Sequence, residues 1–306
     1  MLDNFLHVDD FTDSQLIEIL DKSKWIKQKF KDRADYTPLK GMTMAMIFAK
    51  PSARTRISFE TGFFRMGGHA LFLGPNDIGI GKRESVADVA RVVSRFNDII
   101  MARLFDHKHV LELAEHSSVP VINGLTDFNH PCQIVADLFT VYETLGRYKD
   151  FTLSYVGDGN NITHSWIELA MVLPFKLNVV CPESYKPDME LVQKARDKGL
   201  SEVNVIHDPY EGVKGSDIVY TDVWASMGQK EEAKERERVF KNFQVNNKLM
   251  SLTGKNTLFM HCLPAERDRE VTDEVMESKN SIVFDQAENR MYVQNAIMIM
   301  LSEKWE

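Results

Sequence analysis

The chain has 306 residues, of which 43% are hydrophobic and 27% are charged, and its formal net charge is -8. This length supports a large buried core and divides more naturally into two domains than into one. The negative charge disfavours binding to nucleic acid and to anionic membranes, so an anionic substrate would need a local cluster of positive charge.

The N-terminal sequence and the cysteines bear on the compartment. The opening MLDNFLHVDD lacks a basic, apolar leader, and no apolar stretch approaches the roughly 20 residues of a membrane span. Cys132, Cys181 and Cys262 show no CxxC spacing, which argues against a disulfide framework or a zinc site. We expect a cytoplasmic protein in a reducing compartment, without a nucleic-acid or membrane partner.

Apolar runs rich in β-branched residues alternate with amphipathic stretches along the chain. Helical spacing fills most of the intervals, and this alternation predicts parallel sheets covered on both faces, the doubly wound α/β arrangement. Gly146 and the polar turn 147–150 indicate a domain boundary near 143–150. The expected strands are 43–49, 98–102, 119–122, 151–156, 177–181, 203–206, 217–220, 257–260 and 281–284.

Ligands of open parallel sheets collect outside the carboxyl ends of the strands, where this chain has several polar junctions. The first is the segment 50–56 (KPSARTR), in which the spacing of the following residues predicts a helix start. Free backbone N–H groups there, with the hydroxyls of Ser52 and Thr55, would suit a phosphate. The guanidiniums of Arg54 and Arg56 would add charge. The alternative is a capped helix with exposed arginines.

Two further junctions carry groups that suit an anion and a carbonyl. Arg103 follows the apolar run 98–102, where a cation needs an anion or a carboxylate as partner. His130 and Gln133 are three residues apart, so on a helical turn both side chains could hydrogen-bond a carbonyl oxygen. An internal salt bridge for Arg103 and a structural role for His130 are the alternatives.

The second half of the chain has three polar junctions. The loop 157–161 (GDGNN) resembles a dinucleotide turn, but its spacing is not GxGxxG, so we discount a nucleotide. Asp222 follows an expected strand and could hold an ammonium group. Cys262 is either a buried small hydrophobe or a reactive group. The polar stretch 228–241 is either a solvated helix or loop, or a mobile flap.

Together these segments resemble the ornithine carbamoyltransferase family over essentially the whole chain. The segment 52–56 (SARTR) is similar to the family's Ser-Thr-Arg-Thr-Arg motif, and 130–133 (HPCQ) matches His-Pro-x-Gln. The segment 222–228 matches Asp-x-x-x-Ser-Met-Gly, and 261–264 matches His-Cys-Leu-Pro. The resemblance implies transfer of a carbamoyl group from carbamoyl phosphate to ornithine, giving citrulline and phosphate in arginine metabolism.

The resemblance also assigns roles to individual residues. It implies residues 1–145, completed by the C-terminal helix 288–306, as the carbamoyl phosphate domain, and 146–287 as the ornithine domain. It implies no metal and no cofactor, and a homotrimer or a multiple of trimers. The implied catalytic residues are Arg54, Arg103, His130, Gln133 and Cys262. The implied carbamoyl phosphate ligands are Ser52, Ala53, Arg54, Thr55, Arg103, His130, Gln133, Cys262, Leu263 and Arg290. The implied ornithine ligands are Asn161, Asp222, Ser226 and Met227.

Two positions depart from the family pattern. Ala53 replaces the usual threonine, but this position can act through its backbone N–H. Gly79 stands where many relatives carry a glutamine or histidine that reaches a neighbouring subunit's phosphate. Either Lys82 or Arg83 takes over that contact, or the contact is absent.

Other functions are weighed against this one. Aspartate carbamoyltransferase lacks the Ser-Met-Gly loop and has Pro-Leu-Pro where this chain has 262–264, so it is disfavoured. A putrescine or other amine carbamoyltransferase is a closer rival, and a non-catalytic nucleotide-binding regulatory α/β protein is a rival of another class.

Overall fold

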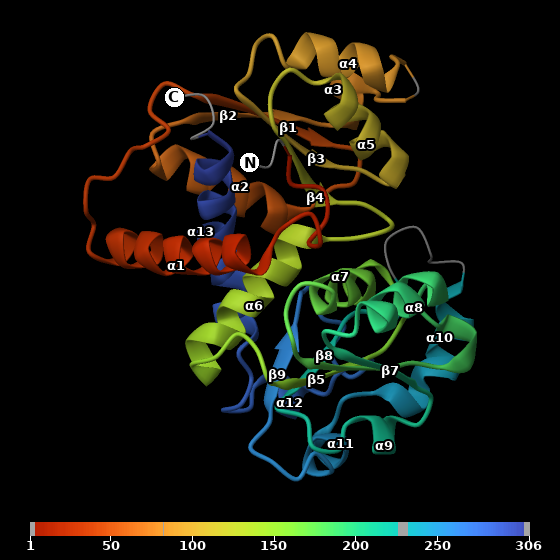
Figure 1. Ribbon diagram of the computed structural model, residues 1–306. Helices are drawn as coiled ribbons and strands as arrows, with labels where there is room; N and C mark the ends of the chain where they lie inside the picture. Colours follow the sequence, from red (N-terminus) through yellow and green to blue (C-terminus); the bar gives the residue numbers. More distant parts are fainter. Residues whose placement is uncertain (1–3, 82, 226–231, 303–306) are drawn as a thin grey trace. The chain divides into compact units, whose positions relative to one another are not determined.

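The structure is a computed structural model that describes residues 4–81, 83–225 and 232–302 (Figure 1). It comprises two compact units, one of residues 1–139 with 288–306 and one of residues 140–287. The chain passes from the first unit to the second within α6 (Pro131–Leu145) and returns within α13 (Val283–Ser302). Among the described residues, no helix is both long and apolar enough to cross a membrane.

The first unit is built on a parallel sheet with the strand order β2-β1-β3-β4. The middle strands are almost wholly buried, whereas the edge strand β2 is partly exposed, which fits strands covered by helices on both faces. The strands are β1 (Thr43–Phe48), β2 (His69–Leu73), β3 (Ile99–Arg103) and β4 (Val121–Leu125). The helices are α1 (Asp13–Lys31), α2 (Ala53–Arg65), α3 (Pro75–Ile78), α4 (Val86–Val93) and α5 (His107–His116).

The second unit is built on a parallel sheet with the order β7-β6-β5-β8-β9. Figure 1 shows α7 and α8 on one side of it and α9, α11 and α12 on the other. The strands are β5 (Thr152–Val156), β6 (Lys176–Val180), β7 (Glu202–Ile206), β8 (Ile218–Thr221) and β9 (Leu258–His261). The helices are α7 (Asn161–Ala170), η1 (Glu183–Tyr185), α8 (Met189–Lys198), α9 (Pro209–Gly212), α10 (Ala233–Phe240), η3 (Lys241–Phe243), α11 (Asn247–Ser251) and α12 (Asp273–Met276).

The order of strands reverses once in each sheet. In the first unit the chain runs from β1 outward to β2 and then returns to β3, and in the second it runs from β5 outward to β7 and then returns to β8. Loops that leave such a reversal point diverge, and the crevice between them is where α/β proteins bind ligands. The loops after β1, β3, β5 and β8 are therefore the places to look for a site.

The predicted fold class is confirmed, with two corrections among the strands. The prediction of a strand at 281–284 was wrong, because only Ser281 makes a single bridge, to Phe259, and α13 begins at Val283. The strand β2 was not anticipated. Its five residues follow a Gly67–Gly68 pair and are half-exposed at a sheet edge, so they lack the continuous apolar run of a buried strand.

Candidate active site

The first part of the site is the start of α2, directly after β1. Ser52 is the N-cap in extended conformation, and its side chain accepts a hydrogen bond from the backbone N–H of Thr55 at 3.3 Å. The first N–H groups of a helix have no partner within it and carry partial positive charge. Ala53 is the first residue of this 13-residue helix, and its exposed position leaves the backbone N–H accessible.

The buried hydroxyl of Thr55 is the point where three side chains of the first unit converge. Nη1 of Arg103 and Nη2 of Arg290 lie 3.3 and 3.0 Å from Thr55 Oγ1, and the hydroxyl of Ser52 lies 3.1 Å from it. Both arginines are buried. Arg103 ends β3 beside Phe48 of β1, whereas Arg290 comes from α13, so the fold gathers charges from distant parts of the chain.

The two arginines of the helix start behave differently. Arg54 is half-buried and, among the described residues, makes no ion pair, so its guanidinium is available to an anion. Arg56 is exposed, pairs with Glu60 at 2.8 Å and lies over the ring of Phe72. Arg56 therefore lies outside the pocket, contrary to the expectation that both arginines would contribute.

His130 lies directly before α6 and is buried. Burial lowers the pKa of His130 well below 6.5, and the nearby charges of Arg290, Arg103 and Lys50 lower it further. The imidazole is therefore neutral near pH 7, and one ring N–H can donate to an oxygen. The positive charges of Arg290, Arg103 and Lys50 act on this imidazole, as they would on an anion bound there.

Gln133 lies one turn into α6. Its Nε2 donates one hydrogen to Oδ1 of Asp137 at 2.8 Å, and its buried Oε1 has no hydrogen-bond partner among the described residues. The side chain thus presents an acceptor, which suits an N–H of a carbamoyl group, and Nε2 has a second hydrogen for the expected bond to a carbonyl oxygen.

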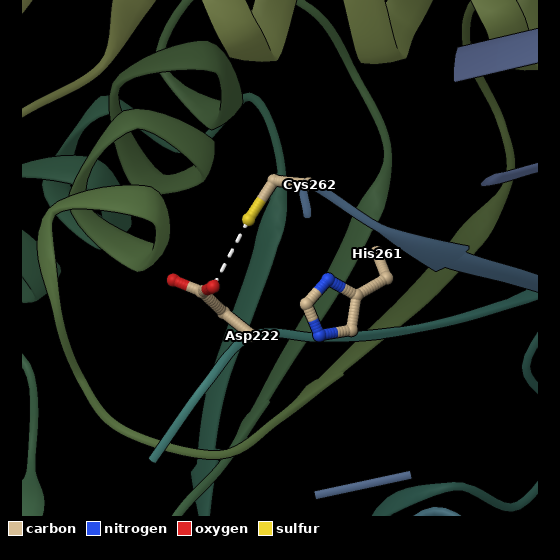
Figure 2. A group of neighbouring side chains, drawn as sticks. All are labelled: Asp222, His261 and Cys262. Carbon is tan, nitrogen blue, oxygen red and sulfur yellow. Dashed lines mark hydrogen bonds between the residues drawn. The ribbon is translucent and has the colours of Figure 1, made fainter. Parts of the chain in front are cut away.

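The second part of the site lies at the reversal point of the other sheet, in the second unit. Asp222 follows β8 and accepts a hydrogen bond from the Cys262 thiol at 3.1 Å (Figure 2). It also accepts from the Val223 N–H at 2.8 Å and from Nδ2 of Asn160 at 3.0 Å. These three donors replace hydrogen bonds that the buried carboxylate would otherwise make to water. Asn161 begins α7 and is half-buried.

Asn160 was missed in the sequence analysis. It caps α7 by accepting from the N–H groups of Ile162 and Thr163, while its Nδ2 bonds Asp222. An asparagine directly before a helix is a known N-cap signal, but its contact with Asp222, 62 residues away, leaves no mark in the sequence. Ser226 and Met227 lie outside the described residues.

The residues Asp222, His261 and Cys262 form a compact group, with one potential metal-ligand atom of each within 4.8 Å of the others (Figure 2). The spacing of the cysteines, which argued against a zinc site, does not reveal a group formed with residues at the ends of two different strands. Both nitrogens of His261 are engaged, however. Nδ1 accepts from the Leu263 N–H at 2.9 Å, and Nε2 lies 3.1 Å from Glu270. A metal would have to displace one of these bonds.

The hydrogen bond from Leu263 to His261 holds an unusual backbone. Leu263 has a φ of 59°, a left-handed conformation that non-glycine residues rarely adopt. The same turn carries Cys262 beside Asp222, so His261 fixes the geometry of the thiol and of the Leu263 backbone together.

The remaining cysteines and the Gly79 loop have structural roles. Burial raises the pKa of Cys132 and of Cys181 to about 12, which makes both thiols unreactive. Gly79 ends α3 with a φ of 56°, where glycine is favoured. Arg83 pairs with Glu84 at 3.2 Å, and Lys82 lies outside the described residues.

One α/β unit has a helix start beside two buried guanidiniums, and the other has a carboxylate beside a thiol. This combination suits a group transferase with an anionic donor, and two family models match the chain. The carbamoyl-P binding domain of aspartate/ornithine carbamoyltransferase matches residues 3–143, and its Asp/Orn binding domain matches 149–301.

Known relatives match over nearly the whole chain. Ornithine carbamoyltransferase, chloroplastic, of Pisum sativum is 58% identical over 97% of this chain and 80% of its own length. The enzyme of Thermococcus kodakarensis is 48% identical over 97% of this chain and 95% of its own. The solved ornithine carbamoyltransferase of Pyrococcus furiosus superposes with a TM-score of 0.93 at 45% identity, covering 98% and 97% of the two chains. The chain belongs to the aspartate/ornithine carbamoyltransferase family, and it is an enzyme of the carbamoyltransferase class.

Proposed function

We propose that this enzyme transfers the carbamoyl group of carbamoyl phosphate to the δ-amine of L-ornithine, giving L-citrulline and phosphate. The observation that carries the donor side is the convergence of Arg103 and Arg290 on Thr55, beside the unpaired Arg54 at a helix start. The relatives named above, all ornithine carbamoyltransferases, support ornithine as the acceptor.

On the donor side, the phosphate would lie against the start of α2. Ser52, the Ala53 N–H, Arg54, Thr55 and Arg103 would bind its oxygens, because guanidiniums and helix N–H groups suit a dianion. This neutralisation also favours departure of phosphate when the C–O bond breaks. No proton needs to be delivered by an acidic side chain for that step.

The carbamoyl end would lie against His130, Gln133 and Arg290. The His130 N–H and the Arg290 guanidinium would donate to the carbonyl oxygen, where negative charge develops as the amine attacks. Each such donor typically contributes about 2.7–4 kcal/mol to transition-state stabilisation. The oxygen of Gln133 would accept from a carbamoyl N–H, and Leu263 would also contribute to carbamoyl phosphate binding.

On the acceptor side, Asp222 would bind the α-ammonium group of ornithine, with Asn161, Ser226 and Met227 around its carboxylate. The attacking amine, with a lysine-like pKa near 10.4, must lose a proton before it reacts. Cys262, which donates to Asp222, would orient and desolvate this amine. Of the polar stretch 228–241, for which a mobile flap was one expectation, residues 228–231 lie outside the described residues and 233–240 form the helix α10.

We propose the domains as residues 1–145 with 288–306 for carbamoyl phosphate and 146–287 for ornithine. The descriptions of the two matching family models support this division of labour. The reversal points of the two sheets support it as well, since the cationic residues gather at one and Asp222 at the other.

The experiment that tests the acceptor compares ornithine with putrescine, which presents the same attacking amine without the α-carboxylate. Each buried polar group left unsatisfied costs about 1–3 kcal/mol, so two such groups make ornithine preferred by roughly a hundredfold in kcat/KM. Comparable use of both amines would overturn the ornithine assignment but leave carbamoyl transfer intact.

The matching variant is Asp222→Asn, which removes the proposed partner of the α-ammonium. Most ornithine binding should be lost, while the affinity for carbamoyl phosphate, measured by calorimetry, should stay nearly unchanged. Asp197→Asn, on α8 of the same unit, is the control and should leave both affinities as they are. Equal loss of both ligands in Asp222→Asn would contradict the assigned role.

We further propose a homotrimer in the cytoplasm that serves arginine metabolism. Free, buried cysteines at 132, 181 and 262 support a reducing compartment. The solved relative from Campylobacter jejuni, 34% identical, is named anabolic, which supports the biosynthetic direction. Saturation kinetics with carbamoyl phosphate, compared with phosphorolysis of citrulline, tests that direction.

A further inference from the structure

Four side chains of the first unit form a closed ring of hydrogen bonds next to His130. Nδ2 of Asn129 lies 3.0 Å from Nδ1 of His7, and Nε2 of His7 lies 3.2 Å from Nε2 of His107. Nδ1 of His107 lies 2.9 Å from Oγ1 of Thr126, which donates to Oδ1 of Asn129 at 3.3 Å.

The surrounding contacts fix the direction of every bond in this ring. Nδ2 of Asn129 also donates to the Leu6 carbonyl at 3.1 Å, and its Oδ1 accepts from Nδ2 of Asn123 at 2.6 Å. The amide nitrogen therefore faces His7, whose Nδ1 must accept, so the proton of His7 is on Nε2. His107 then accepts on Nε2 and carries its proton on Nδ1.

The ring ties together three segments that are far apart in the sequence. His7 lies in the N-terminal segment, where Phe5 bridges to Ile122 of β4, and His107 begins α5. The loop between β4 and α6 supplies the other two members. The Phe128 ring in that loop packs against both imidazoles, with centroids 6.0 Å from His7 and 5.0 Å from His107.

We propose that His7 and His107 are positioning residues for carbamoyl transfer, which act by holding Asn129 and thereby placing the adjacent His130 against the carbamoyl group. This inference rests on the role given to His130 in the proposed function. Neither imidazole touches a substrate in that scheme. The hydrogen bonds of the ring hold the loop 126–129 in one conformation. This matters because misplacement of a catalytic donor by about 1 Å can cost a hundredfold in rate.

Protonation is incompatible with the ring. A second proton on His107 would be on Nε2, facing the N–H of His7, and the ring would open. The pKa of His107 is lowered to about 4 by burial and by His7, against the opposing effect of Asp106. Three further carboxylates lie beside the ring. Asp127 accepts from the His107 backbone N–H at 3.2 Å, Asp10 accepts from the His7 backbone N–H at 3.0 Å, and an oxygen of Asp9 lies within 4.8 Å of a ring nitrogen of His7.

The first test measures the tautomers directly in the wild-type enzyme. Histidine-selective 15N NMR at pH 7.5 should find His7 protonated at Nε2 and His107 protonated at Nδ1, with assignment by single-histidine variants. An Nε2–H tautomer of His107, or a charged imidazole at either position, would overturn the ring. This readout does not depend on activity or on the stability of a variant.

The second test separates the carbamoyl end of the substrate from the phosphate end. In His107→Ala and His7→Ala, kcat/KM for carbamoyl phosphate should fall about tenfold or more, while inhibition by inorganic phosphate stays within about twofold. A general loss of structure would weaken both. The double variant should be little worse than either single variant, because removing one member already opens the ring.

Two controls keep the inference and the proposed function apart. His116→Ala, at the other end of α5, should leave both quantities unchanged, because this side chain lies at the end of the helix remote from the ring. His130→Ala should depress kcat/KM at least as strongly as the ring variants. If His130→Ala has the effect and His107→Ala does not, the positioning role fails alone. If His130→Ala also has no effect, the proposed role of His130 fails.

Discussion

The donor site brings together two buried arginines that contact one neutral hydroxyl. Arg103 and Arg290 both donate to Thr55 Oγ1, which orients the two guanidiniums toward one point. A phosphate placed there would accept charge-assisted hydrogen bonds from both. His130 is neutral beside them chiefly because it is buried, and the positive charges of the two arginines lower its pKa further.

Arg54 gives the sharpest test of phosphate capture. Arg54→Ala removes a guanidinium that has no ion pair among the described residues, so affinity for carbamoyl phosphate should fall by about 2–3 kcal/mol and turnover should nearly vanish. Arg54→Lys should also be poor, because a point ammonium does not reproduce the planar fork. Calorimetry and steady-state kinetics measure both.

Arg56 is the matched control for Arg54, two residues along the same helix. Its side chain is engaged with Glu60 and Phe72, so Arg56→Ala should change carbamoyl phosphate affinity by no more than about twofold. Unchanged affinity in Arg54→Ala, or an equal loss in both variants, would contradict the proposed phosphate site.

His107 should make the stability of the enzyme depend on pH. Its pKa is lowered from 6.5 to about 4 on folding, so the unfolded chain binds the proton first as the pH falls. Above about pH 6.5, this group does not lower the free energy of unfolding. The free energy of unfolding falls progressively between about pH 6.5 and pH 4, and His107 causes no further loss below that range. His107→Gln should therefore flatten the decline of the urea midpoint over this interval. An unchanged slope would show that His107 does not titrate as described.

The helices and strands that could be predicted from the sequence are those whose own residues show a strong local pattern. The buried strands β1, β3 and β5 are continuous apolar runs, and the residues just past them carry the binding groups because parallel strands end at one edge. The half-exposed edge strand β2 has no such run. Residues 281–284 look like a strand because Ile282, Val283 and Phe284 are apolar, yet they lead into a helix whose period becomes visible only over a longer window.

Contacts between distant residues could not be predicted at all. Neither the bond from Asn160 to Asp222 nor the ring that joins His7 to His107 has a spacing rule, since each depends on where separate loops meet. The same holds for Arg56, whose exclusion from the pocket depends on the position of Phe72 on the unanticipated strand. Motif resemblance supplied the site residues where spacing supplied none.

A buried ion pair joins α10 to the loop after β5. Arg236 and Asp158 form a buried pair at 2.7 Å, with 7% and 14% of their side chains exposed, and Arg236 also donates to the Trp224 carbonyl at 2.9 Å. Removing one member of such a pair typically costs about 3–5 kcal/mol. Arg236→Met should therefore lower the free energy of unfolding by about that amount in urea titrations.

A double variant shows whether Arg236 and Asp158 contribute to stability as a coupled pair or independently. The pKa of Asp158 is raised by its burial even though Arg236 opposes the shift, so the lone carboxylate is costly to keep charged. Asp158→Asn combined with Arg236→Met should recover part of the stability lost in Arg236→Met alone. Strictly additive losses would refute the coupling.

At the scale of the whole molecule, the two units repeat one design with different chemistry. Each has a parallel sheet that reverses its strand order once, and the loops proposed to bind the substrates leave the sheet at that reversal. The first unit supplies guanidiniums, a neutral imidazole and a helix start, and the second supplies a carboxylate and a thiol. An anionic donor and a cationic acceptor need opposite environments, and two separate units provide them.

Large apolar side chains remain exposed on the first unit, which favours self-association there. Ile57 and Phe64, seven residues apart on one face of α2, are 62% and 73% exposed, and Leu71 on β2 is 42% exposed. Phe64→Asp would place an unpaired charge in a contact made by this face, which is strongly unfavourable once buried. We therefore expect light scattering after gel filtration to find about three times the 35.1 kDa chain mass for the wild type and a shift toward the single chain for Phe64→Asp.

Phe284→Asp, on a residue 62% exposed in the second unit, is the matched control and should keep the wild-type mass. A wild type that elutes as a single chain, or a mass lowered by Phe284→Asp but not by Phe64→Asp, would contradict assembly through the first unit.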